Sequence, residues 1–197
     1  TAAAPTPARA AAPTSKNRSP NFPMIGLKKA IERVQTVFKH EGKNYAHVSV
    51  LVEHWGYAAK SSGGKQTLGA LNAYGLLEFK GEGDKREGKL SDPALRIVLG
   101  TPEKPDLLKA AALRPRIHAE IWAKYRDSGL PSDANLANYL VLEHDFNKDS
   151  TAAFIRQFRE TVGYAGLTNE YTIGPDSSPG EEDGADPMVA EPEVFAE

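Results

Sequence analysis

The chain contains no cysteine, and this absence excludes three kinds of chemistry at once. Disulfide bonds, thiolate zinc sites and cysteine nucleophiles all require a thiol. Long apolar runs are lacking too, since none approaches the roughly 18 residues that a membrane-spanning helix needs. The first residues carry a few charges but no apolar stretch like that of a secretory signal. We therefore expect a soluble, cytoplasmic protein that makes no membrane contact.

Side chains at catalytic or metal-binding spacing are also lacking. His47 and His54 are seven residues apart on one predicted helix, too far to bind one metal ion without further ligands. Glu143, His144 and Asp145 are adjacent, and adjacent residues of a helix point in different directions. No serine lies in a nucleophile elbow, and no pair of carboxylates favours acid–base catalysis. We predict a protein that is not an enzyme and binds no metal and no cofactor.

Both ends of the chain have compositions that bury little apolar surface. Residues 1–19 are mainly Ala, Pro, Thr and Ser, and residues 168–197 contain nine acids but neither Lys nor Arg. We expect a disordered N-terminal segment and a disordered acidic tail there. Without the three basic residues of the first and the nine acids of the second, 21 basic and 17 acidic residues remain, a net charge of about +4. This mildly basic balance suits a nucleic-acid-binding protein but does not identify one.

The chain does contain a repeated pattern, in which the same features follow one another in the same order at two places about ninety residues apart. An apolar block, a polar break, a second apolar block and a Gly-Leu pair occur over residues 54–76 and again over 144–167. Few residues are identical between the copies, so the order rather than the sequence recurs. The recurrence predicts two related units.

The first copy lies in a pattern that is typical of a winged helix-turn-helix. Apolar residues at helical spacing predict helices over 27–38, 48–55 and 65–74, and Ser61 and Ser62 are good N-caps for the third. Three short helices in this order form a compact unit.

The period then changes from helical to alternating. Leu77 and Phe79 alternate with charged residues, the Gly-rich run 81–88 predicts an exposed turn, and 89–91 returns as a strand. A short helix over 94–99, capped by Asp92-Pro93, closes the unit. We predict a mainly α fold with a small β-hairpin and place the winged-helix domain at residues 20–100.

The second half reads as helices without an obvious wing. Prolines at 102 and 105 mark a hinge, and Pro115 interrupts the helical pattern between 107 and 125. Ser132 caps a further helix, and Asp149 or Ser150 caps the last one. We predict a second, degenerate winged-helix-like or helical domain at residues 101–167. Either 94–99 or 107–125 offers a surface for a homodimer, and the sequence does not decide between monomer and dimer.

Candidate nucleic-acid contacts follow from the predicted winged helix, whose third helix enters the major groove while the hairpin meets the backbone. Gln and Asn pair with adenine edges, Lys and Arg contact phosphate, and small residues such as Gly69 and Ala73 allow close approach. The candidate contacts to double-stranded DNA are Lys60, Ser61, Ser62, Lys65, Gln66, Asn72, Lys85, Arg86 and Lys89.

The sequence also allows a non-functional interpretation of this surface and an alternative function, and it excludes one nucleotide-binding motif. These side chains could be ordinary solvated polar residues, since Glu78, Glu82, Asp84 and Glu87 lie on the same hairpin. The run 61–67 is not a phosphate-binding loop of nucleotide enzymes, because that motif requires glycine at position 59 and a hydroxyl at position 66. A protein–protein interaction module that uses the acidic tail is the alternative function.

The order of the first half resembles a broad set of uncharacterised prokaryotic winged-helix-like proteins. The resemblance rests on Ser-Pro-Asn-Phe-Pro at 19–23, Ser-Gly-Gly-Lys-Gln-Thr-Leu at 62–68, Tyr-Gly-Leu-Leu at 74–77 and Leu-Ser-Asp at 90–92. The second half is similar to their C-terminal helical part through 154–158 and Tyr-Ala-Gly-Leu at 164–167. It implies a bacterial, archaeal or phage source and a winged-helix-like fold, and it implies no catalytic residues.

Overall fold

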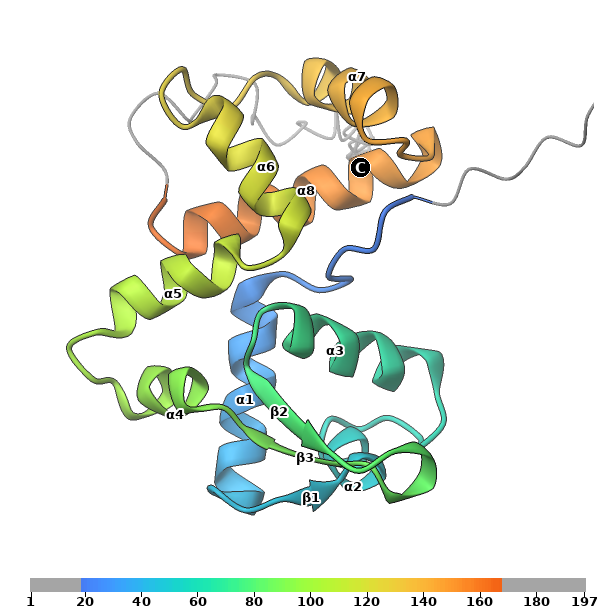
Figure 1. Ribbon diagram of the computed structural model, residues 1–197, viewed down its shortest axis with the longest axis vertical. Helices are drawn as coiled ribbons and strands as arrows, with labels where there is room; N and C mark the ends of the chain where they lie inside the picture. The colour runs from blue at the N-terminus through green and yellow to red at the C-terminus, as the bar shows by residue number, and fades with distance from the viewer. Residues whose placement is uncertain (1–18, 168–197) are drawn as a thin grey trace, which may run out of the picture.

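The computed structural model describes residues 19–167. The predicted disordered segments 1–19 and 168–197 lie outside this range, apart from Ser19, whose Oγ lies 2.6 Å from Ser150 Oγ. Within the described part the chain forms eight α-helices and one small antiparallel sheet, which confirms the mainly helical prediction with a small hairpin (Figure 1). None of these helices is long and apolar enough to cross a membrane.

The first half alternates helices with the strands of the sheet. Its elements are α1 (Leu27–Glu41), β1 (Ala46–His47), α2 (Val48–His54), α3 (Ser62–Ala73), β2 (Leu77–Lys80), a 3₁₀ turn (Gly83–Lys85), β3 (Glu87–Leu90) and α4 (Asp92–Leu99). The strand order is β1-β3-β2, with both pairs antiparallel. The strand β1 was not anticipated, because two residues are too few to show an alternating pattern.

The second half is helical throughout its described residues. It consists of α5 (Lys104–Leu113), α6 (Arg116–Tyr125), α7 (Asp133–Glu143) and α8 (Lys148–Tyr164). The helix break at Pro115 and the Ser132 cap are as predicted, since Ser132 Oγ accepts a hydrogen bond from the Asn135 amide.

Two predicted helix caps and the placement of His47 need correction. Ser91, not Asp92, caps α4, because its hydroxyl accepts from the Ala94 amide at 3.3 Å. Asn147, not Asp149 or Ser150, caps α8 through its side-chain oxygen. His47 is the cap of α2 rather than part of the helix, since its ring nitrogen accepts from the Ser49 amide. In α4 and α8 the oxygen nearest the open N–H groups lies one to three residues earlier than expected.

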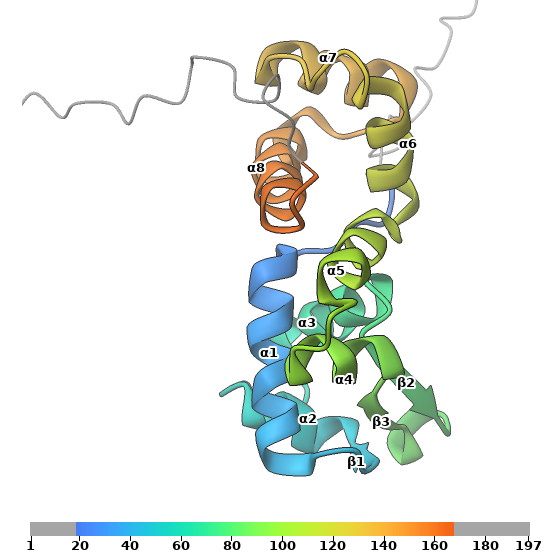
Figure 2. The same ribbon diagram turned by 90° about the vertical axis from the view of Figure 1, so that its left-hand side faces the viewer.

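The described residues form two hydrophobic clusters, and the elements that carry them stack along the long axis of the molecule (Figure 2). The first packs α1 to α4 and the sheet, together with Leu108, Ala111 and Ala112 of α5. The second packs α6, α7 and α8, although Ala165 at the end of α8 belongs to the first cluster and Phe22 packs against the second. The helix α5 thus adds its buried face to the first core, although it follows the predicted hinge. The domain boundary at residues 100–101 stays a prediction.

A buried polar junction fixes the end of α3 against α8. Tyr74, the C-cap of α3, donates from its hydroxyl to the Ile25 carbonyl at 3.0 Å and accepts from Gln157 Nε2 at 2.5 Å. Thr161 Oγ1 accepts from the Leu27 amide at 3.1 Å and lies 3.3 Å from the Tyr74 hydroxyl. Burial raises the pKa of Tyr74, so the phenol stays neutral. Because buried hydrogen bonds are directional, this junction sets the orientation of α3.

Candidate nucleic-acid interface

The helix α3 has one face in the core and one open face. Ser61 Oγ caps it by accepting from the Gly64 amide at 3.1 Å, and its buried positions are Gly64, Thr67, Ala70 and Leu71. Of the predicted outward residues, Lys65, Gln66, Gly69 and Asn72 are exposed and Ala73 is half-buried. The helical period therefore predicted the exposure of these four residues correctly.

Gly69 differs from the other two glycines of α3. A Cβ at Gly64 would lie 2.4 Å from Val52 Cγ1, and one at Gly63 would lie 2.9 Å from Tyr57 Cε1, so packing requires both glycines. A Cβ at Gly69 would meet nothing within 4 Å. Glycine in a helix interior costs about 1 kcal/mol relative to alanine. Packing within the fold therefore does not require glycine at position 69, but a partner that approaches the helix closely would require it.

A hollow of about 250 Å³ separates α3 from the hairpin, and it brings three of the predicted contacts together. It is lined by Lys65, Leu68, Gly69, Asn72, Phe79 and Arg86. The Arg86 guanidinium lies over the Phe79 ring, 4.0 Å from its centroid, which holds the charge toward α3.

The opposite face of the hairpin carries cations that are already neutralised. Lys80 pairs with Glu87 at 2.8 Å, and Lys89 pairs with Glu78 at 3.2 Å. Both ammonium groups also lie over the Tyr45 ring. The Glu78 carboxylate accepts a hydrogen bond from Lys89 and raises its pKa. Because side chains alternate along a strand, Lys89 points away from Phe79 and the structure does not bring it to α3 with Arg86.

The remaining predicted residues surround the start of α3 and the hairpin turn. Ser61 is engaged as the cap, Ser62 is the first helical residue, and Lys60 precedes them in an exposed position. Lys85 is exposed in the 3₁₀ turn. In contrast to Lys80 and Lys89, the cations Lys60, Lys65, Lys85 and Arg86 have no carboxylate of residues 19–167 within 4.0 Å.

The turn that carries Lys85 is tied to α2. The ring of His47 accepts from the Ser49 amide at Nδ1, so its Nε2 carries the proton and donates to the Asp84 carbonyl. This bond holds the turn beside the start of α2. The acids Glu82 and Asp84 are exposed on the same turn and weaken its positive field.

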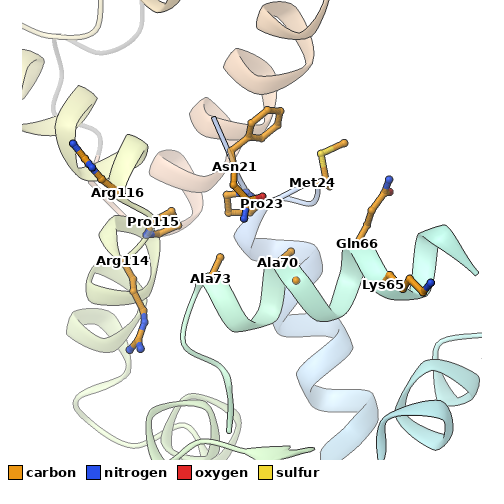
Figure 3. Close-up of a pocket in the computed structure, with 12 residues that line it drawn as sticks. Asn21, Pro23, Met24, Lys65, Gln66, Ala70, Ala73, Arg114, Pro115 and Arg116 are labelled. Carbon is orange, nitrogen blue, oxygen red and sulfur yellow. The ribbon is translucent and has the colours of Figure 1, made fainter. Parts of the chain in front are cut away.

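Sequence reasoning missed a second hollow, of about 480 Å³, on the other side of α3 (Figure 3). It lies between α3, the segment 21–24 and the junction of α5 with α6. Asn21, Arg114 and Arg116 line it together with Lys65 and Gln66, and no acidic residue does. The signal in the sequence was Arg-Pro-Arg at 114–116, two arginines flanking a helix break, but nothing in the sequence indicated that this break faces α3.

The histidines do not form a metal site within the described part of the chain, where no group of three potential ligands occurs. His54 Nε2 lies 2.6 Å from Glu41 Oε1, and its ring stacks on that of His40 at 4.4 Å. His118 is buried and donates from Nδ1 to the Ala112 carbonyl at 2.9 Å. These contacts give each ring a structural role.

No protein-family model matches the chain, and no curated protein or solved structure matches it. The resemblance to prokaryotic winged-helix-like proteins therefore stays a prediction. The geometry around α3 is the basis for a functional proposal.

Proposed function

We propose that residues 20–100 form a winged helix-turn-helix domain. The element order α1-β1-α2-α3-β2-β3 supports this assignment, with α3 as the recognition helix and the turn between β2 and β3 as the wing. The central position of β3 in the sheet further supports it, because β1 then joins the hairpin to the helices. The turn at 83–85 lies within residues 80–86, all of which are exposed.

The function that this domain supports best is non-enzymatic binding of double-stranded DNA, as in a transcriptional or replication-associated regulator. The main observation behind the proposal is the exposed face of α3. This face carries Lys65, which has no carboxylate partner among the described residues, and it lies opposite a second such cation, Arg86. A cation without a carboxylate partner retains its full charge for phosphate. Paired cations such as Lys80 contribute less, because their charge is already matched.

Roles follow from the side chains and their positions. Gln66 and Asn72 are suited to bidentate hydrogen bonds with adenine in the major groove, and Gly69 allows the helix to lie close to the base edges. Lys60, Lys65, Lys85 and Arg86 would contact phosphate. Ser61 is occupied as a cap, so we assign to it the fixing of the helix start.

The test is a salt series of duplex binding, measured by fluorescence anisotropy with a labelled DNA. We compare the wild type with a variant that combines Lys65→Ala, Lys85→Ala and Arg86→Ala. Since each phosphate contact contributes about 0.9 to the slope of log K against log salt, the variant should bind more weakly with a slope shallower by about 3.

A charge-matched control separates local contacts from net charge. The variant Lys28→Ala, Lys29→Ala, Lys39→Ala removes three exposed cations of α1 and should leave the slope nearly unchanged. Equal slopes for the wild type and the α3 variant, or no binding by the wild type, would contradict the proposal. The protein-interaction alternative stays a prediction, since its acidic tail lies outside the described residues.

A further inference from the structure

The second hollow beside α3 is lined by residues from both halves of the molecule. Lys65 and Gly69 line this hollow and also the one next to the hairpin, so the open face of α3 lies between two depressions. In Figure 3, Lys65 and Gln66 lie at one end of α3, and Arg114 lies beyond the other end, past Ala73. Between the two ends the helix presents only small residues to this hollow, namely Gly69, Ala70 and Ala73.

The position of Arg114 depends on the glycine that ends α3. Gly75 has a φ of +71°, and a Cβ there would lie 2.5 Å from Arg114 Nη1 and 2.7 Å from Cζ. Glycine therefore serves two purposes, since it adopts the left-handed conformation and leaves room for the guanidinium. The guanidinium of Arg114 thus lies close to the backbone at the end of α3.

The charge of Arg114 is unmatched within residues 19–167, where no carboxylate lies within 4.0 Å of it. Its neighbour Arg116 differs, because its Nε donates to Glu120 Oε1 at 2.6 Å. In Figure 3 the two side chains also point in opposite directions, and Arg114 is the one directed along the end of α3. A planar guanidinium with free donors is well suited to a phosphate group.

A helix in the major groove has one phosphate backbone on each side of it. Arg86 borders α3 on the hairpin side, and Arg114 borders it on the side of the helical half. We infer that Arg114 binds the phosphodiester backbone opposite to the one that the hairpin contacts, so that the helical half is part of the DNA-binding surface. This inference rests on the proposed function and adds to it a contact from outside the winged-helix domain.

The test uses the full chain, the same labelled duplex and the variant Arg114→Gln, which removes the charge but keeps a stem to pack on Gly75. The slope of log K against log salt should become shallower by about 1, and Arg114→Lys should retain the slope because it retains the charge. Arg156→Gln is the matched control, since Arg156 is an exposed arginine of α8 that lines neither hollow. It should behave as the wild type.

The outcomes separate this inference from the proposed function. If Arg114→Gln keeps the wild-type affinity and slope while the α3 and hairpin variant loses both, the Arg114 contact is refuted and the winged-helix interface stands. If Arg114→Gln and Arg156→Gln weaken binding equally, a general charge effect replaces the inference. A wild type that does not bind duplex DNA would refute both. Thermal unfolding of each variant, expected to stay within a few degrees of the wild type, shows that a lost contact is not lost folding.

Discussion

The helices α3 and α8 occupy corresponding positions in the repeated pattern, and they end in the same way. The Leu76 amide bonds to the Leu71 carbonyl and the Leu167 amide to the Val162 carbonyl, each across a glycine with positive φ. Their surroundings differ. The helix α3 buries four residues and lines two hollows, whereas α8 buries seven residues, packs against α1, α5 and α7, and lines neither hollow.

The repeated local pattern therefore specifies where a helix ends but not which neighbours its faces contact. In α3 the buried positions carry small residues or leucine, and the open face carries Lys, Gln, Gly and Asn. In α8 the corresponding stretch carries Phe154, Ile155 and Phe158, which build the second core. The helix α8 therefore joins the two halves, and the open face of α3 is the one that we propose binds DNA.

The largest effect should come from truncating an aromatic side chain of α8. Phe158 is fully buried and contacts the rings of Phe154 and His118, so Phe158→Ala should lower the free energy of unfolding by about 3–5 kcal/mol. Asn72→Ala, on the open face of α3, should change it by less than about 0.5 kcal/mol. Urea unfolding followed by circular dichroism measures both. Equal losses of unfolding free energy in the two variants would contradict the difference between α8 and α3.

A pH-dependent effect should follow from His118, which packs against α8. Burial lowers its pKa from 6.5 to about 4, so the unfolded chain binds a proton at a higher pH than the folded one. Its contribution to stability is complete above pH 6.5 and is lost as the pH falls toward 4, by about 3 kcal/mol at most. Unfolding curves at several pH values should show this loss, and His118→Asn should flatten it. An unchanged pH dependence in the variant would assign the loss to other groups.

The smallest effect concerns Gly69 on the open face of α3. Gly69→Ala should raise the free energy of unfolding by about 0.5–1 kcal/mol, because the new methyl group meets nothing and the helix gains propensity. Gly69→Leu should fold as well but bind duplex DNA more weakly than the alanine variant, since its side chain would stand between α3 and the base edges. Thermal unfolding and anisotropy measure the two effects. If the leucine variant binds as tightly as the alanine variant, α3 does not need to lie close to the base edges.

Much of this architecture could be predicted from the sequence, because helices and hairpins leave local signals. The spacing of Leu27, Ile31 and Val34 gave α1, Ser61 gave the start of α3, and the alternation from Leu77 gave the hairpin. The strand β1 could not be predicted, since it exists only through pairing with Gly88 and Glu87 of β3.

The candidate site was predictable only where it lies on one element. Lys65, Gln66 and Asn72 share a helical face and were found from the period alone. Arg114 reaches α3 through the packing of α5 on the first core, and Lys89 is matched by Glu78 across the hairpin. Such contacts depend on tertiary structure, which the local pattern does not contain.

Amide chemical-shift mapping of the isotope-labelled protein during titration with a short duplex DNA shows which helix binds the DNA. The proposed interface predicts that the largest changes fall on α3 and on residues 83–90 of the hairpin, with α8 nearly unaffected. The largest changes on α8, with α3 unaffected, would contradict it.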